Sequence, residues 1–217
     1  PIRESRIAWN TEAGFVSKPG WLVPGSAIKG ALRHRTAFHL RCQRERWAHN
    51  LAVPEADAQK ASGGADLDPW APEMDTPGGE AGFEQLFGRI HDEEAGQIDE
   101  RDGRGVAGRV MIPDIWVDDA ETVVFDHVSL DRFTGGAMPG LLFSDQALTG
   151  GTLELDITIK PGAENIPAEV RRAFDAALGD LCSGRLQIGA GSGRGYGYFQ
   201  GSTPEWSGPD ANIWRSN

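Results

Sequence analysis

The stretch PAEVRRAFDAALGDLCSGRLQIGAGSGRGYGYF (residues 167–199) is the most informative part of this 217-residue chain. After Pro167, a residue suited to the first position of a helix, apolar residues recur from Val170 onward at the spacing of one helical face. Gly184 is placed to end this helix in the left-handed conformation. Arg185–Ile188 then has the pattern of a strand, so the stretch predicts a helix followed directly by a strand.

Glycine occupies every second position of the segment that follows, Gly189–Gly197. Alternate glycines let a ligand approach the backbone closely and leave amide groups able to bind an anion. No Gly-Lys-Ser/Thr follows, as a P-loop would need, and Tyr198 and Phe199 favour a strand where a Rossmann turn needs a helix. Two interpretations stay open: a glycine-rich bulge packed on a helix, or a phosphate-binding loop, which Arg194 favours.

The segments before this helix have the patterns of strands. Thr152–Lys160 alternates strictly between apolar and polar residues, as a half-buried strand does. Thr122–Leu130 alternates less regularly, and Arg109–Val117 is apolar but interrupted by Pro113, which predicts an edge strand or a bulge. Phe133–Gly140 is expected to form a glycine-rich turn or hairpin.

A second long helix is predicted nearer the N-terminus. Ser26 is a good N-cap, and the Pro-free segment Ala27–His49 carries apolar residues on roughly one stripe. Before it, the alternation around Ile7–Trp9 indicates an edge strand, followed by a loop. With that strand, the order of elements is β-α-β-β-α-β, which predicts an α+β chain of ferredoxin-like arrangement. We expect one domain over residues 1–201 and a tail or linker over residues 202–217.

The net charge of −11, from 21 basic and 32 acidic residues, argues at first sight against nucleic-acid binding. The acids are concentrated, however: residues 50–82 carry seven acidic residues and one basic residue, and residues 89–108 carry six and three. Residues 26–49 carry six basic residues and one acidic residue. Because residues 50–82 are aperiodic and rich in glycine and proline, we predict a disordered insertion there and an acidic loop over residues 89–108.

Cysteine content and hydropathy bear on where the protein works. Cys42 and Cys182 are too few for a disulfide framework, which indicates a reducing, cytoplasmic setting. No apolar run is long enough for a membrane helix and no signal peptide is recognised, so we expect no membrane partner. Because Pro1 stands where a native chain normally has Met, we expect a trimmed or excised segment.

Three segments carry side chains suited to chemistry. On the basic helix, Lys29 and Arg33 are one turn apart and Arg44 returns to nearly the same face, so these cations could follow a phosphate backbone. A solvated surface is the alternative. The segment HVSLDRFTGG (residues 127–136) either wedges between bases or forms a structural turn. Finally, His39, Cys42 and His49 are candidate metal ligands, although their spacing matches no zinc pattern and a buried cysteine is the alternative.

Several of these motifs occur in the order found in one known family. PGSAIKGALRHR (residues 24–35), LFG (86–88), GRV with Asp114, HVSLDRFTGGAM followed by LLF, and LQIGAGSGRGYGYF (186–199) together resemble the RAMP superfamily over about residues 22–200. More narrowly, the chain resembles the backbone subunit of type III CRISPR effector complexes of antiviral defence, or one such domain of a fused single-chain effector.

The resemblance implies a ferredoxin-like palm of the modified RNA-recognition-motif type, with a hairpin thumb, that holds guide RNA by its phosphates. It implies guide RNA, target RNA and other effector subunits or domains as partners, and no cofactor for binding. The RNA-binding residues that the resemblance implies are Ser26, Lys29, Arg33, Gly193, Arg194 and Gly195 in the palm, and Arg132 and Thr134 in or beside the thumb. Arg44 is added to them as the third cation of the basic helix face.

Two alternatives are enzymes. Target-cutting members of the family carry an aspartate in the loop before the PGS motif, whereas residues 1–25 contain only Glu4 and Glu12 as acids. A metal-dependent endoribonuclease would hold Mg²⁺ or Mn²⁺ on a carboxylate such as Glu12 or Asp131. A guide-processing ribonuclease of the same superfamily would need a histidine base near the glycine-rich loop, and residues 184–201 contain none.

Overall fold

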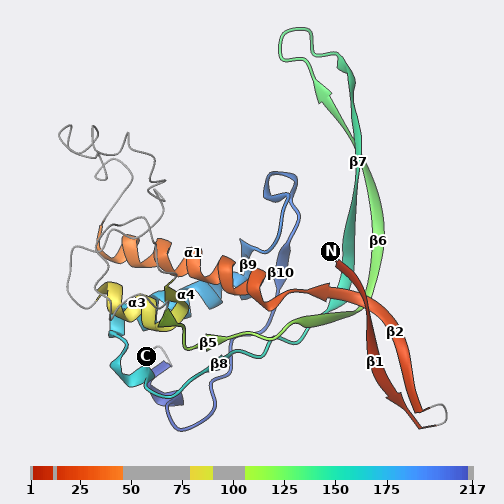
Figure 1. Cartoon of the computed structure of the whole chain (residues 1–217). Helices are drawn as coiled ribbons and strands as arrows, with labels where there is room; N and C mark the ends of the chain where they lie inside the picture. Colours follow the sequence, from red (N-terminus) through yellow and green to blue (C-terminus); the bar gives the residue numbers. More distant parts are fainter. Residues whose placement is uncertain (1, 12–13, 46–78, 90–105, 215–217) are drawn as a thin grey trace, which may run out of the picture. The chain divides into compact units, whose positions relative to one another are not determined.

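The computed structural model (Figure 1) describes residues 2–11, 14–45, 79–89 and 106–214. Contacts divide the chain into two compact units, each assembled from two separate segments. The hairpin unit comprises Pro1–Gly25 and Pro113–Asp156, and the helical unit comprises Ser26–Ile112 and Ile157–Asn217. Most of the predicted insertion (50–82) and of the predicted acidic loop (89–108) lies outside the described residues.

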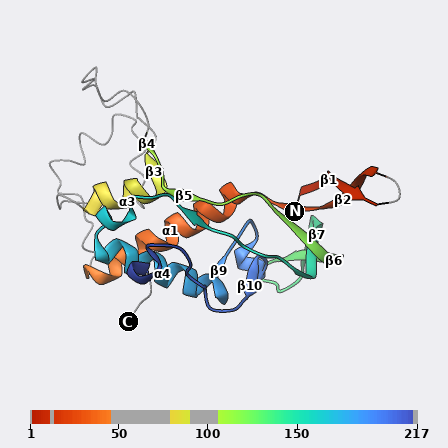
Figure 2. The same cartoon turned by 90° about the horizontal axis from the view of Figure 1, so that it is seen from below.

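The helical unit contains helices and short two-stranded ladders (Figures 1 and 2). The helices are α1 (Gly25–Gln43), α3 (Gly79–Phe87), α4 (Ala168–Cys182) and α5 (Ala211–Trp214). The antiparallel ladders pair β3 (Gly88–Arg89) with β4 (Val106–Ala107), β5 (Val110–Met111) with β8 (Thr158–Ile159), and β9 (Ser183–Gln187) with β10 (Tyr198–Gln200). Short 3₁₀ turns lie at Ala163–Asn165 and Ser192–Arg194.

The core of the helical unit is formed by apolar faces of its helices. Ile28, Leu32 and Leu40 of α1 are buried, as is Leu86 of α3 and the apolar stripe of α4. An aromatic chain then joins three helices, because Phe87 contacts Phe174 at 5.8 Å between ring centres and Phe174 contacts Trp214 at 5.8 Å. The segment 202–217 therefore supplies a buried ring, Trp214, to this core.

The hairpin unit is one antiparallel sheet with strand order β1-β2-β6-β7. Its strands are β1 (Ile2–Asn10), β2 (Gly14–Val23), β6 (Ile115–Leu130) and β7 (Ala137–Thr152). The β6–β7 hairpin is the longest ladder and carries a register shift between Val128 and Leu130, next to its turn. The buried apolar side chains of this unit are few among the residues described: Leu22, Ile115 and Val117.

The α+β class expected from the sequence is confirmed, and so is the interruption at Pro113, which separates β5 from β6. Three expectations were wrong in detail. The segment after Trp9 is not a loop but a turn and β2, which pairs with β1 from Ile2↔Leu22 to Asn10↔Gly14. Helix α1 ends at Gln43 because Glu45 adopts a left-handed φ of 55°, so the helix does not run on to His49, which lies outside the described residues.

The third correction concerns the strand expected over Thr152–Lys160. Its exposure does alternate as predicted, but beyond Thr152, which ends β7 opposite Asp118, a ladder forms only at β8, where the opposing β5 is two residues long. Among the described residues, no helix is both long and apolar enough to cross a membrane.

Candidate nucleic-acid interface

The basic face of α1 is the first part of the candidate interface. Ser26 is exposed in the first turn of α1, and Arg33, one turn after Lys29, is also exposed. Arg33 lies over the ring of Phe83, with 5.8 Å from its Cζ to the ring centre. Lys29 is half-buried and its Nζ donates to the carbonyl of Val110 at 2.9 Å. Lys29 and Arg33 therefore both have neutral partners.

Lys29 sits in a positive environment. Burial of its ammonium, and then the nearby charges of Arg33 and Lys160, hold the pKa of Lys29 below its ordinary value of 10.5. An anion bound beside Lys29 would relieve this repulsion, because the neighbouring charges that disfavour the ammonium form would be compensated.

Arg44 has different surroundings from Lys29 and Arg33. It follows the end of α1, and its Nη2 forms an ion pair with Glu169 Oε1 at 2.6 Å. Glu169 lies in the first turn of α4, where an acid is favourable to the helix dipole. The sequence placed Arg44 with the other two cations; in the structure its charge is already compensated by a carboxylate.

The N-terminus of α1 also has a partner. The amide of Gly25, the first residue of the helix, donates to Asp114 Oδ1 at 2.8 Å. A carboxylate at a helix N-terminus occupies the position that a phosphate would otherwise favour. Ser26 is thus not the N-cap that the sequence suggested, and Asp114 supplies the side-chain acceptor instead.

The glycine-rich loop separates into structural and open positions. Gly191 and Gly197 have left-handed φ values of 87° and 80°, and a Cβ at either would collide with the loop: with the Tyr196 ring at Gly191, and with the Ile188 carbonyl at Gly197. A Cβ at Gly193 would meet nothing within 4 Å. Both interpretations of the loop therefore have support, because some glycines are required for packing and Gly193 leaves the backbone accessible.

Arg194 completes the open part of the loop. Arg194 is exposed within the 3₁₀ turn Ser192–Arg194, and its Cζ lies 5.8 Å from the centre of the Tyr196 ring. Gly195 follows with a φ of 81° and open space around its Cβ position. The accessible stretch Gly193–Gly195 thus presents one cation and backbone amides together, a combination that suits an anion.

The turn between β6 and β7 is organised by Asp131. Its Oδ1 accepts the amides of Phe133 and Thr134, both at 2.8 Å, while its own amide donates to the Gly136 carbonyl at 2.8 Å. The amide hydrogen bonds from Thr134 and Phe133 hold the pKa of Asp131 below its ordinary value. Asp131 therefore builds the turn, which leaves Arg132 and Phe133 exposed at its tip.

Two of the three candidate metal ligands, His39 and Cys42, lie among the described residues. His39 Nε2 lies 2.7 Å from Asp180 Oδ2, and Cys42 is a free, half-buried thiol. His49 and Glu12 lie outside the described residues. Over the parts of the chain that are described, no group of three or more His, Cys, Asp or Glu side chains could hold a metal ion.

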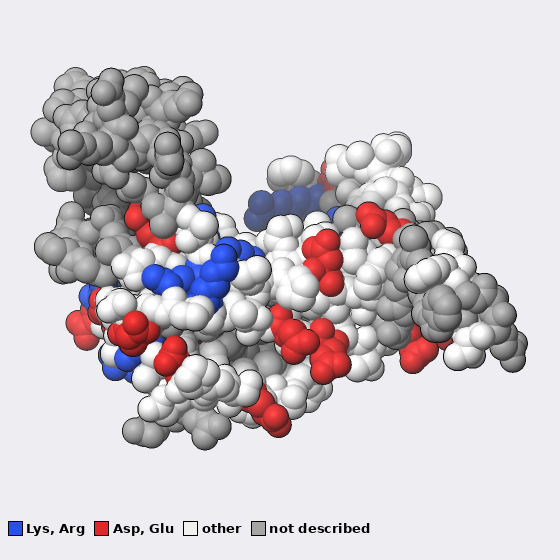
Figure 3. All heavy atoms as spheres, turned by 60° about the horizontal axis from the view of Figure 1, so that its bottom comes forward, with Lys and Arg blue, Asp and Glu red and all other residues white. Residues whose placement is uncertain are grey.

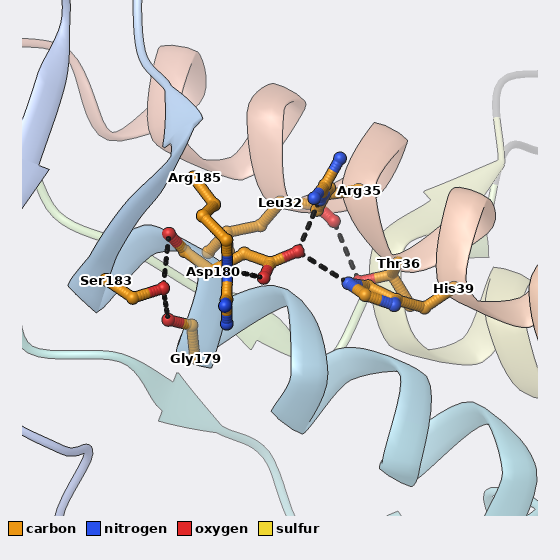
Figure 4. A network of polar contacts seen from close by, with 8 residues as sticks. All are labelled: Leu32, Arg35, Thr36, His39, Gly179, Asp180, Ser183 and Arg185. Carbon is orange, nitrogen blue, oxygen red and sulfur yellow. Dashed lines mark hydrogen bonds and ion pairs between the residues drawn. The ribbon is translucent and has the colours of Figure 1, made fainter.

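Asp180 instead anchors a structural network (Figure 4). Its buried carboxylate accepts from Arg35 Nε at 2.5 Å and Arg185 Nε at 2.8 Å, and contacts His39. Burial alone raises the pKa of this carboxyl, but the hydrogen bonds from Arg35, His39 and Arg185 outweigh burial and hold the pKa below its ordinary value. The network ties α1 to α4 and β9.

A family model of the RAMP superfamily matches residues 5–200, which covers both units. The chain belongs to the RAMP superfamily. Membership indicates a CRISPR-associated, RNA-binding function. No curated protein gives a significant match to the chain.

The structure brings Ser26, Lys29 and Arg33 together on α1, and Gly193, Arg194 and Gly195 together in the glycine-rich loop of the same unit. Arg132 and Thr134 belong to the other unit, in the β6–β7 turn. Sequence reasoning missed Asp180 and the helix-end role of Asp114. The signal that could have revealed Asp180 is an acid at a position of α4 that is otherwise on the apolar face.

Proposed function

We propose that this RAMP protein binds CRISPR guide RNA along its phosphate backbone and shapes the guide–target duplex, as a backbone subunit or domain of a type III effector. Its partners would be guide RNA, target RNA and the other subunits of that effector. The helical unit would correspond to a ferredoxin-like palm and the β6–β7 hairpin to the thumb. Binding itself would require no cofactor.

The observation that carries this proposal is the state of the cations on the helical unit. Lys29 and Arg33 are held by a carbonyl and a ring, so their charges remain uncompensated, whereas Arg44 is neutralised by Glu169. Cations that are fixed in place without an acidic partner suit the phosphates of RNA. Contact through phosphates also explains why binding would be blind to sequence.

The hairpin supports the second part of the proposal. At its tip, Phe133 is 96% exposed beside Arg132, on a turn that Asp131 holds rigid with two backbone hydrogen bonds. An exposed ring next to a cation suits stacking on a nucleobase. Arg132 and Thr134 would contact RNA on either side of Phe133.

The test is binding of a short, fluorescein-labelled single-stranded RNA, followed by fluorescence anisotropy at several salt concentrations. With three to five phosphates contacted, the slope of log affinity against log salt is expected to be about −2 to −4. RNAs of unrelated sequence should give the same affinity. A flat salt response, or strong preference for one sequence, would contradict the proposal.

The nuclease alternatives receive no support from the described site residues. Asp131, the candidate acid within the described ranges, uses one carboxylate oxygen for the turn. Cleavage by the assembled effector with Mg²⁺ or Mn²⁺, compared with its Asp131→Ala and Glu12→Ala variants, tests this directly. We expect no cut that depends on either residue; cuts that disappear in one variant would identify a catalytic carboxylate.

A further inference from the structure

A second pair of cations lies at the β5–β8 ladder, which accepts a hydrogen bond from Lys29 at Val110. β5 and β8 pair with Val110 opposite Ile159, and the amide of Lys160 donates to the carbonyl of Arg109 at 3.0 Å. Arg109 and Lys160 are therefore opposite each other in an antiparallel ladder, where directly opposed side chains project from the same face. Like charges in this arrangement repel each other.

The guanidinium of Arg109 is fixed by neutral groups. Its Nη1 donates to the carbonyl of Pro161, and the guanidinium lies over Gly162, where an added Cβ would come within 2.6 Å of Nη1. Gly162 has a φ of 95°, which also favours glycine. The turn after β8 thus accommodates the guanidinium and orients it without neutralising it.

Lys29 connects this pair to α1. Its Nζ donates to the carbonyl of Val110, the residue after Arg109, and the charges of Arg33 and Lys160 are close enough to lower its pKa. Four cations from three segments of one unit therefore form a cluster: Lys29, Arg33, Arg109 and Lys160. Figure 3 shows Lys and Arg side chains gathered in a patch on one face of the molecule.

The partners of these four cations distinguish them from three other arginines of the unit. Arg35, Arg44 and Arg185 each contact a carboxylate. Among the described residues, none of the four cations of the cluster forms an ion pair. These four cations repel one another and have no acidic side chain in the described part of the chain to compensate them, so an external anion that binds beside them would reduce the repulsion.

We propose that Lys29, Arg33, Arg109 and Lys160 form a single site that binds neighbouring phosphates of the RNA backbone. This inference rests on the proposed function and adds Arg109 and Lys160 to it. An ammonium has three donors and Lys29 uses one on Val110, so two remain for phosphate oxygens. The fixed guanidinium of Arg109 provides a planar fork, and Lys160 provides a point charge opposite to it.

The experiment measures affinity and salt slope for the same labelled single-stranded RNA with Lys160→Gln, Arg109→Gln and Arg109→Lys. Exposed Arg172 of α4 supplies the control, since Arg172→Gln removes one positive charge from the same unit outside the cluster. We expect Lys160→Gln and Arg109→Gln to weaken binding about five- to tenfold and each to reduce the salt slope by about 0.7. Arg172→Gln should bind like the unmodified chain, and Arg109→Lys should fall between.

The outcomes separate this inference from the proposed function. If Lys29→Gln and Arg33→Gln weaken binding while Lys160→Gln does not, the extended site is refuted and the proposed function stands. If the unmodified chain does not bind RNA, both the proposed function and the proposed site are refuted. An equal loss in Arg172→Gln would show a diffuse charge effect and also refute the site. Thermal unfolding accompanies each variant; because Lys160 is exposed, its variant decides the matter even if Arg109→Gln unfolds.

Discussion

Phe174 in α4 and Phe133 in the β6–β7 turn are the same residue type in opposite surroundings. Phe174 is 0% exposed and touches rings from α3 and α5, whereas Phe133 is 96% exposed. The contrast extends to their units. The helical unit buries large apolar side chains such as Leu32 and Leu86, while Val124, Leu130 and Leu142 of the hairpin unit are each more than 60% exposed.

This difference indicates how each unit is stabilised. The helical unit has its own core, so its folding is explained by burial within the chain. The β6–β7 hairpin relies on cross-strand contacts such as the stacked His127 and Phe143 rings, 5.0 Å apart, and the hydrogen bond from Ser144 to Asp126 at 2.6 Å. An exposed apolar surface of this kind is typical of an interaction site. In the proposed function, the helical unit would contribute charge and the hairpin would contribute apolar surface.

The largest effect we expect comes from exchanging the two phenylalanines for alanine. Phe174→Ala removes a ring from a packed core and should lower the free energy of unfolding by about 3–5 kcal/mol. Phe133→Ala should change the free energy of unfolding by less than about 0.5 kcal/mol, because the exposed ring is not packed in a core. Urea unfolding measures both. Equal losses in the two variants would show that the hairpin tip is packed and would remove the contrast.

The second effect concerns the Asp180 network. Because the folded-state pKa of Asp180 lies below its ordinary value of 3.8, the network adds stability above that pH and loses it as the pH falls through the lower, folded value. Asp180→Asn should therefore lower the free energy of unfolding at pH 7 by roughly 2–3 kcal/mol. It should also flatten the loss of stability in acid.

Exposed Glu205 provides the matched control for this prediction. Glu205→Gln removes a carboxylate from the same unit but no network, so its unfolding curve should follow that of the unmodified chain across pH. An Asp180→Asn variant as stable at pH 7 as the unmodified chain would show that the three basic partners gain nothing from this carboxylate.

The success of the sequence prediction depends on how local each signal is. Helix α4, the left-handed Gly184 and the break at Pro113 were all predicted, because spacing, backbone freedom and a missing amide act within a few residues. The alternation over Thr152–Lys160 predicted exposure correctly but not the ladder, since a ladder needs a partner that the strand itself does not specify.

The site shows the same division. Lys29 and Arg33 were predicted to share one face because they are one turn apart on a predicted helix, and α1 confirms that helix. The neighbouring arginines differ from these two because they contact carboxylates that are distant in sequence. Arg35 contacts Asp180, 145 residues away, and Arg44 contacts Glu169, 125 residues away. Which arginine is neutralised and which remains available for an anion is thus a tertiary property, and composition could not separate Arg44 from Arg33.

The glycine-rich loop provides the third test, within a single segment. Gly197→Ala places a Cβ against the Ile188 carbonyl at a φ of 80°, so it should cost about 1–3 kcal/mol of stability. Gly193→Ala meets open space and should leave thermal unfolding nearly unchanged. If RNA phosphates approach the backbone at Gly193, the same methyl group should weaken RNA binding. Unchanged RNA affinity in Gly193→Ala would place the phosphates elsewhere and favour a purely structural loop.

The smallest effect we expect is at the start of α1. Asp114 accepts the Gly25 amide at 2.8 Å, so Asp114→Ala leaves that amide to water and should cost about 1 kcal/mol of stability, as the loss of a helix cap does. Asp114→Asn keeps an oxygen acceptor but removes the charge, and should cost less.

Both variants also remove a negative charge from the helix N-terminus, where it competes with phosphate, so both should bind RNA slightly more tightly at low salt. Thermal unfolding and RNA anisotropy, measured on the same samples, distinguish the two roles. If stability falls in Asp114→Ala while RNA affinity is unchanged in both variants, Asp114 acts only as a cap and phosphates do not reach this end of the helix.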